Sequence, residues 1–537
     1  MKHLTMALPT LALSAILAGS AWSKTFEVGP GESVQAAVDA ATSGDTIVIS
    51  GIHRENVSVN NAGLTLVGQN GTIDGQYFAY SVAVWVPDVT IKGLKVIHGA
   101  PGIRVIADRV EVRDCTFKAC EDHALEIDGD DAVIRKNDFE SGGGVRYLSA
   151  TAQSDSRFEK NEVKNCESVD LEGGRLSVQD NSFVGCGGVS VAVNHASESS
   201  LVKENVATSL GDAGFVVRAS SAGSVVVVGS ESRRSRGDGL RVETFDAASA
   251  LVKKNKIVAS EDDGLKLIHG SSGVFGTYGN QVDWAGREGI DARVDGSGVL
   301  LLRHDVVERA EEEGIEVSHE VGATGVILVV QAKVRDTGYD GLRLSNEPGV
   351  PFTVSGCDVR RALGRGIRAN GVGITLLDND VRQCDGDGIF ASGGDFVVRG
   401  NSVKSCAKNG IEFSFSVGGV SVIEENVVRK CGRDGFQIHG GAQLIDNQSN
   451  QNRGDGIDVA SGSFVLLDGN VCLDNAHEGI DNSGTNTTIA NNQMFGNGGT
   501  LGPDLAGRGT GSGTTTFGSS VNQFGSGGLT TLQRLDQ

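Results

Sequence analysis

The 537-residue sequence has little proline, few aromatic residues and a deficit of positive charge. It holds only 7 prolines, and its 77 glycines follow no Gly-X-Y period, which excludes collagen. The 47 basic residues are outnumbered by 68 acidic ones, so the net charge is −21 and we expect no nucleic-acid partner. After the N-terminal segment, no run approaches the roughly 18 apolar residues of a membrane-spanning helix, so we expect no membrane span.

The N-terminal segment has the features of an export signal. Lys2 and His3 give a positive start, and an apolar run follows from Leu4 to Ala18. Ala21 and Ser23 place small residues at the −3 and −1 positions of a cleavage site. We therefore predict a signal peptide over residues 1–23 and a secreted protein, either extracellular or periplasmic.

The rest of the chain is built from a repeat of about 21 to 27 residues, the period range of stacked repeat architectures. Most repeats carry a glycine followed by a large apolar residue, which we call the anchor; in one repeat Ala124 precedes the anchor Leu125, and Val169 fills another anchor position. Leucine-rich repeats, calcium-binding nonapeptide arrays and propellers fit this spacing less well. The anchor pairs include Gly214-Phe215, Gly239-Leu240, Gly264-Leu265, Gly289-Ile290, Gly314-Ile315, Gly341-Leu342, Gly366-Ile367, Gly388-Ile389, Gly410-Ile411, Gly435-Phe436, Gly456-Ile457 and Gly479-Ile480.

An asparagine marker recurs in phase with the anchor, for example at Asn401 and Asn426, and a short β-type run follows each one. Asparagine suits tight turns, and stacked asparagines can bond to one another along a ladder. Between the markers, apolar residues alternate with period 2, which indicates three short strands per repeat. Such a unit buries its apolar face only when it is wound into a coil and stacked on copies of itself. We therefore predict an all-β fold of about 20 coils.

The N-x-V…C-x-x-x-x-G-I pattern and the segment 31–75 resemble right-handed parallel β-helix repeat proteins of the pectin-lyase-like superfamily. The resemblance implies one right-handed β-helix over residues 24–495. In segment 31–75, Val34, Ala37, Val38 and Ala41 share one face of a short helix, and the resemblance makes that helix the N-terminal cap. Residues 496–537 are rich in Gly, Ser and Thr and form a C-terminal cap or tail in this interpretation.

Nine cysteines are unusual for an exported chain, but four of them share one slot of the repeat. Cys120, Cys384, Cys406 and Cys431 each lie five residues before an anchor residue, where other repeats have Ser, Ala or Thr. A slot that takes small residues predicts buried free thiols. Stacked neighbours could also approach disulfide distance, so bridging stays open as an alternative.

The outward positions after the anchor carry the candidate chemistry. We predict that Lys266, Asp291, Glu316 and Arg343 project in parallel from successive coils as catalytic residues. A lyase needs a base beside a uronate and cations to stabilise the enolate, whereas a hydrolase needs two carboxyl groups, here Asp291 and Glu316. The alternative is a charge ladder that only supports the sheet. The predicted substrate-binding residues are Arg241, Glu243, His269, Arg293 and His319.

Acidic residues also stack in the turn just before the anchor. Because like charges about 5 Å apart repel, Asp262, Asp263, Glu288 and Glu313 are candidate ligands for a hard cation such as Ca²⁺. The alternative is ordinary Asp-Gly turn chemistry. We expect no cofactor to be required, with calcium as the one ion that the stack could bind.

Motifs of known enzymes of the superfamily do not match. The DDG segment 262–264 resembles the paired aspartates of polygalacturonases, but their Gly-His-Gly and Arg-Ile-Lys segments are missing. The Asp-Pro-His-Glu segment of alginate epimerases and a clear pectate-lyase set are missing too. We therefore predict a monomer that contacts an extracellular polysaccharide, as a lyase, hydrolase or epimerase of uncharacterised specificity. The rival hypothesis is a non-catalytic surface, structural or adhesion rod.

Overall fold

The computed structural model describes residues 23–498 except 150, 152, 195–198, 347–348, 416–419 and 462–463. It also describes three short strands further on, β59 (Leu505–Gly507), β60 (Thr516–Phe517) and β61 (Gln523–Phe524). Residues 1–22 of the expected signal peptide and most of the expected C-terminal segment lie outside the described residues. Within the described part, no helix is long and apolar enough to cross a membrane.

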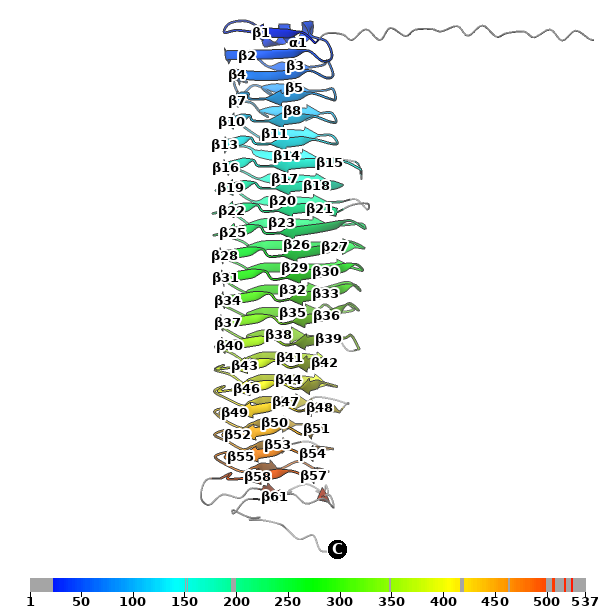
Figure 1. Cartoon of the computed structure of the whole chain (residues 1–537), viewed down its shortest axis with the longest axis vertical. Coiled ribbons are helices and arrows are strands. Elements are labelled where there is room, and N and C mark those ends of the chain that lie inside the picture. Colours follow the sequence, from blue (N-terminus) through cyan, green and yellow to red (C-terminus); the bar gives the residue numbers. More distant parts are fainter. Residues whose placement is uncertain are drawn as a thin grey trace, which may run out of the picture.

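The chain winds into a parallel β-helix of about 19 turns with three strands in a typical turn (Figure 1). One turn consists of β29 (Leu265–Ser271), β30 (Val274–Tyr278) and β31 (Gln281–Ala285), and each strand pairs in parallel with its equivalents in the turns above and below. We call the faces that contain these three strands face 1, face 2 and face 3. The predicted all-β coil is confirmed.

Face 1 carries the candidate site. Its strands are β3 (Val57–Val59), β5 (Val82–Val84), β8 (Ile103–Ile106), β11 (His123–Asp128), β14 (Gly144–Leu148), β17 (Val169–Gly173), β20 (Val189–Val193), β23 (Phe215–Ala219), β26 (Leu240–Asp246), β29, β32 (Ile290–Val294), β35 (Ile315–His319), β38 (Leu342–Ser345), β41 (Ile367–Val372), β44 (Ile389–Gly394), β47 (Ile411–Phe415), β50 (Phe436–His439), β53 (Ile457–Ser461), β56 (Ile480–Asn482) and β59. Pairing of β56 with β59 carries this face past residue 495.

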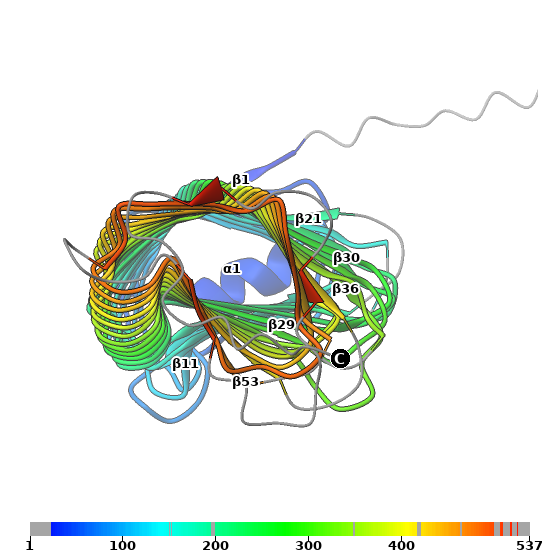
Figure 2. The same ribbon diagram turned by 90° about the horizontal axis from the view of Figure 1, so that it is seen from below.

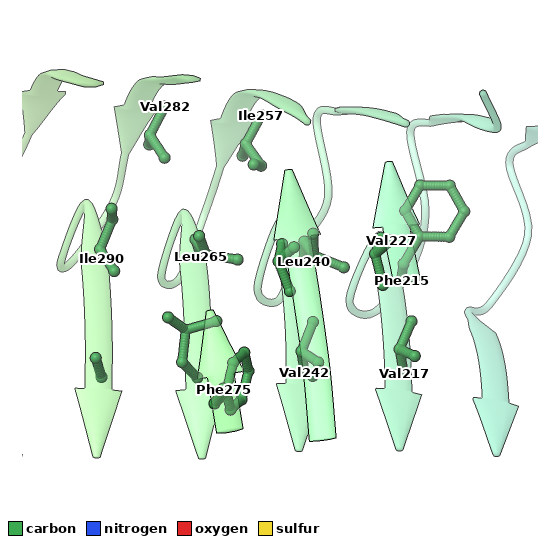
Figure 3. Close-up of a cluster of buried hydrophobic side chains, with 14 of the residues drawn as sticks. Phe215, Val217, Val227, Leu240, Val242, Ile257, Leu265, Phe275, Val282 and Ile290 are labelled. Carbon is green, nitrogen blue, oxygen red and sulfur yellow. The ribbon is translucent and has the colours of Figure 1, made fainter. Parts of the chain in front are cut away.

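The core forms because the anchor residue of each turn points inward and stacks on the anchor of the next. Phe215, Leu240, Leu265 and Ile290 are partners in the strand register, and all four are buried. Figure 3 shows this file of side chains. Burying each such side chain contributes about 1.5–3 kcal/mol, and the gain repeats in every turn.

The glycine before each anchor is required by close approach between neighbouring turns. A Cβ built on Gly264 would lie 2.5 Å from the carbonyl oxygen of Gly289 and would also collide with Val282. The same geometry recurs at Gly289, where the carbonyl oxygen of Gly314 would lie 2.5 Å away. Glycine therefore lets these central turns stack at this distance, whereas two earlier turns have Ala124 and Ser168 before the anchor.

A short helix closes the N-terminal end, as predicted. Helix α1 (Val34–Ala40) begins after Ser33, whose hydroxyl accepts a hydrogen bond from the backbone N of Ala36 at 3.2 Å. Val34 and Val38 are buried against the core. Figure 2, a view along the coil axis, shows α1 lying across the end of the coil, where it covers the first turn and its exposed backbone.

The asparagine ladder forms at the corner between faces 2 and 3. Asn401 donates from both its backbone N and its Nδ2 to Oδ1 of Asn426, each at 2.9 Å, and both residues are fully buried. The left-handed turn residue is the one before the asparagine, for example Glu425 with φ of 57°. A second ladder of Asn452, Asn475 and Asn497 was not predicted.

All nine cysteines are buried and free, which confirms the predicted thiol column. Cys384, Cys406 and Cys431 are at most 1% exposed and follow one another in successive turns. These three thiols therefore act as small apolar side chains that fill the corner between face 3 and face 1, whereas Cys115 and Cys357 lie in line with the asparagine ladder.

Candidate functional site

The four predicted catalytic residues form one row across face 1. Lys266 lies opposite Asp291, Asp291 opposite Glu316, and Glu316 opposite Arg343 in the register of β29, β32, β35 and β38. Arg241 on β26 extends the row at its N-terminal end. Adjacent parallel strands lie about 4.8 Å apart, so one ligand can contact the whole row.

Lys266 links this row to the acidic turn beside it. Its Nζ lies 2.6 Å from Oδ2 of Asp263 and 3.1 Å from Oδ2 of Asp291. Asp263 is completely buried, whereas the side chains of Lys266 and Asp291 keep about a fifth of their surface exposed. The lysine therefore neutralises one buried carboxylate and still presents a cation to solvent.

Arg343 has the same bridging role at the other end of the row. Its Nη1 lies 3.0 Å from Oε1 of Glu313 in the turn, and its Nε lies 3.5 Å from Oε1 of Glu316 in the row. The row thus consists of two adjacent carboxyl groups flanked by two cations, and each cation is held by a second acid from the turn.

Both carboxyl groups of the row titrate above their ordinary range. Burial raises the pKa of Asp291, although the charge of Lys266 opposes the shift. Burial likewise raises the pKa of Glu316, against the attraction of Arg343. A carboxyl group whose pKa is raised can act as a proton donor closer to neutral pH, which suits acid–base chemistry.

The three charged residues among the predicted substrate-binding residues all form ion pairs. Arg241 and Glu243 lie beside the row, but Glu243 is buried between Arg241 (Nε to Oε1, 2.5 Å) and Arg218 (Nε to Oε2, 2.8 Å). Arg293 pairs with Asp295 at 2.8 Å and Glu320 at 3.1 Å. Arg241 is thus the member of this set closest to the catalytic row.

The expectation that His269 and His319 face outward is wrong. Counting inward and outward positions from the anchor Leu265 places His269 inside, where it is 0% exposed and contacts Oγ1 of Thr244 at 2.9 Å. His319 is also buried, and its Nε2 lies 2.6 Å from the carbonyl oxygen of Gly325. Burial lowers the pKa of His269 to about 4, so it stays neutral in the core.

The turn carboxylates stack as predicted but form two clusters. Oxygens of Asp238, Asp262 and Asp263 lie within 4.8 Å of one another, and those of Glu288, Glu312 and Glu313 form a second such group. The four predicted metal ligands are therefore divided, Asp262 and Asp263 in the first cluster and Glu288 and Glu313 in the second.

Cations of the chain itself neutralise much of this acidic stack. Arg287 lies 3.4 Å from Asp262, 3.6 Å from Glu288 and 3.9 Å from Glu312. Asp238 differs, because it is 6% exposed, its Oδ1 has no hydrogen-bond partner and, unlike Glu288, it forms no ion pair among the described residues. The first cluster is thus the one that is left with an unneutralised buried carboxyl group.

Proton sharing relieves a further part of the repulsion. Burial, together with a hydrogen bond to Asp263, raises the pKa of Glu288 to about 9, so this side chain is protonated at neutral pH. Burial alone would raise the pKa of Asp263, but hydrogen bonds with Glu288 and Lys266 hold it below its usual value. Burial and the charge of Asp263 raise the pKa of Asp238 to about 6.

Two adjoining hollows lie on face 1, N-terminal to the row. One of about 610 Å³ is lined by Asp170, Asp212 and Arg218 among others, and one of about 430 Å³ by Arg104, His123 and Glu126 among others. Glu167 and Ser168 line both, so the hollows form one elongated depression.

Sequence reasoning missed three parts of this region: the depression, the bridging Arg287 and the buried Asp238. Gly187 and Gly188 line the larger hollow and have no side chains, so this glycine pair is a sequence feature that could have indicated the depression. Arg287 and Asp238 were harder to find, because their role depends on which turn carboxylates become buried.

Comparisons with solved structures find several chains of low sequence identity. Two structures of the periplasmic alginate epimerase AlgG, one of them a mutant, are 13–14% identical with TM-scores of 0.37–0.39, covering 59% of this chain and 77% of theirs. The Dettilon tailspike protein is 11% identical with a TM-score of 0.32, covering 62% of each chain. The PL6 family alginate lyase AlyGC is 12% identical with a TM-score of 0.29, covering 93% of this chain and 100% of its own.

A search of curated proteins finds no significant match. The family model described as "Right handed beta helix region" matches residues 42–207 and 320–471, which together exceed half of the chain. The match agrees with the parallel β-helix of the structure. The chain therefore belongs to the right-handed β-helix family.

Proposed function

We propose that this protein is exported and acts as a monomer that binds an extracellular polysaccharide along face 1. The row of Lys266, Asp291, Glu316 and Arg343 then performs acid–base chemistry on the bound chain. The observation that carries the proposal is the pairing of two neighbouring carboxyl groups of raised pKa with two flanking, partly exposed cations. The depression further along the same face supports a long ligand, since a polymer in the row would extend over it.

The row offers the groups that cleavage of a sugar polymer needs. Asp291 and Glu316 project from strands about 4.8 Å apart, close to the roughly 5–5.5 Å between the carboxyl groups of a retaining glycosidase. One carboxyl group would protonate the leaving oxygen and the other would attack or stabilise the sugar. With a uronate substrate, the same groups can abstract a proton while Lys266 and Arg343 stabilise the developing negative charge.

The test is a panel of neutral and anionic polysaccharides, assayed for binding, for new reducing ends and for unsaturated products. We expect one polymer to be converted by the wild type, and the rate to fall at least 100-fold in Asp291→Asn and Lys266→Gln, the scale of a lost acid–base group. Asp283→Asn is the matched control, because this exposed aspartate lies on face 3 in an ion pair with Arg309. Conversion that survives both face 1 substitutions refutes the row as the site.

Absence of binding and conversion across the whole panel would instead favour the non-catalytic rod. Binding without conversion would retain the polysaccharide partner and reject the chemistry. Epimerised sugars without cleavage would retain proton abstraction at the row and reject hydrolysis.

We also propose that Ca²⁺ binds the cluster of Asp238, Asp262 and Asp263. The support is the buried, unpartnered oxygen of Asp238 beside two further carboxylates, since hard cations take several carboxylate oxygens. The test is a calcium titration read by thermal unfolding, with magnesium alongside. We expect a rise in Tm that Asp238→Asn abolishes, and an unchanged Tm in the wild type rejects the site.

A further inference from the structure

Face 3 carries a file of positive charge that the candidate site does not use. Arg335 lies opposite Arg360, Arg360 opposite Arg382, Arg382 opposite Lys404, and Lys404 opposite Arg429. We call these five residues the basic stripe. They project from β37 (Lys333–Thr337), β40 (Asp358–Ala362), β43 (Asp380–Arg382), β46 (Ser402–Lys404) and β49 (Val427–Arg429).

Such a file is unfavourable in the isolated protein. Like charges directly opposite on adjacent strands destabilise a sheet, and these lie about 4.8 Å apart over four successive intervals. The whole chain has a net charge of −21, so this file of five cations contrasts with its acidic composition. In the next turn the residue opposite Arg429 is Asn450, which carries no charge, so the basic stripe ends at Arg429.

The neutralising acids cover only part of the stripe. Asp358 contacts Arg360 at 2.6 Å and Arg335 at 4.0 Å, and Asp380 contacts Arg382. Lys404 and Arg429 have no salt bridge within the described part of the chain, in contrast to Lys266 and Arg343 on face 1. The C-terminal half of the stripe is therefore an unneutralised cationic surface.

The stripe also borders a hollow of about 270 Å³. Its lining consists of Arg360, Arg361, Arg382, Gln383, Lys404 and Ser405. The three arginines are paired with Asp358, Asp336 and Asp380, and Lys404 is the lining cation without a salt bridge among the described residues. Arginine presents a planar fork of N–H donors that matches a carboxylate, whereas lysine supplies a mobile point charge. The hollow can thus hold an anionic group between neighbouring turns.

We propose that the basic stripe binds a linear anionic polysaccharide that carries regularly spaced carboxylates. The stripe runs parallel to the coil axis for about 19 Å, four strand spacings, so an extended polyanion can contact successive cations. The stripe lies on a different face from the row of Lys266 and Asp291, so this site is separate from the proposed active site and does not depend on it.

The neighbouring side chains favour a polysaccharide over nucleic acid. Proteins that bind single-stranded nucleic acid without sequence preference stack bases on aromatic side chains. The neighbouring outward residues, two positions earlier on the same strands, are Lys333, Asp358, Asp380, Ser402 and Val427, and none of them is aromatic. The stripe therefore offers charge recognition without a stacking surface.

The test measures binding of fluorescent polygalacturonate oligomers by anisotropy, at low salt and at about 0.15 M salt, where screening weakens exposed contacts. We expect Kd to rise at least tenfold in Lys404→Glu/Arg429→Glu, with a smaller rise in the neutral pair Lys404→Gln/Arg429→Gln. The matched control is Lys136→Glu/Lys160→Glu, which changes the net charge equally at two exposed corner lysines of earlier turns, and its Kd should stay within twofold.

Three results would overturn the assignment. Equal weakening in the control pair would show that only net charge matters. Undetectable binding to the wild type would remove the site. Tighter binding of single-stranded DNA of the same charge would indicate nucleic acid as the ligand.

Discussion

Asn280 donates two hydrogen bonds to a single carboxylate oxygen of Asp305, one from its backbone N and one from its Nδ2, both at 2.8 Å. Asp305 therefore stands where the ladder elsewhere has asparagine. It is fully buried, and this burial raises its pKa to about 6, although hydrogen bonds from Thr277 and Asn280 oppose the shift.

We predict that Asp305→Asn stabilises the protein at neutral pH. In the wild type, the stability linked to Asp305 is complete below its unfolded pKa of about 3.9 and is lost as pH rises through about 6, because the folded state holds the proton more tightly. Two pKa units correspond to a gain on the order of 3 kcal/mol for the variant at pH 7. Urea unfolding at pH 4 and pH 7 measures it, with Asp283→Asn as an exposed control. An equal effect of Asp305→Asn at both pH values would contradict the account.

Lys266→Met should destabilise the fold as well as remove a cation from the candidate site. The substitution leaves Asp263, which is 0% exposed, without its ion pair at 2.6 Å. Removing one partner of a buried pair typically costs about 3 kcal/mol or more. The measurement is the urea midpoint, compared with Lys254→Met at an exposed corner. A midpoint equal to that of the wild type would mean that Asp263 is not buried as a charge.

Gly264→Ala should disrupt the stacking of the central turns. The new methyl group would lie 2.5 Å from the carbonyl oxygen of Gly289, so neighbouring turns must separate. Overpacking of this kind costs typically 1–3 kcal/mol. Gly276→Ala is the control, since its Cβ would meet only the side chain of Leu251 at 3.6 Å. Thermal unfolding distinguishes the two, and equal Tm values for both variants would contradict close approach as the reason for the anchor glycine.

The cysteines should be unreactive in the folded protein. All nine are buried and free, and burial raises the pKa of Cys115 and of Cys357 to about 12, which suppresses the reactive thiolate. Ellman's reagent should therefore detect almost no thiol under native conditions and nine after unfolding without a reductant. Fewer than nine would reveal a disulfide between stacked turns, the alternative that the spacing alone leaves open.

The sequence predicts which residues of face 1 point outward. Side chains alternate between inward and outward along a strand, and the buried anchor fixes which positions point inward. Counting from Leu265 and Ile290 places Lys266 and Asp291 outward and in register, as the structure has them. The same count places His269 inward, contrary to the expectation that it lies on the outer surface. A polar residue at an inward position is accommodated by a local partner, here Thr244.

The turn could not be predicted in the same way. Asp263 and Glu288 look like ordinary turn acids in sequence, yet packing of the corner buries both and makes them share a proton. Whether a turn carboxylate is buried depends on the width of the neighbouring turns and on cations such as Arg287 that reach it from another coil. The local sequence pattern gives neither the width of the neighbouring turns nor the positions of these cations.

The most direct test of polysaccharide recognition on face 1 is a crystal structure of the protein with an oligosaccharide selected from the polymer panel. The account predicts sugar density over β29, β32, β35 and β38, with a sugar oxygen within hydrogen-bond distance of Asp291 or Glu316 and a polar group facing Lys266 or Arg343. Well-defined density confined to another face, with this row still closed by its own ion pairs, would contradict it.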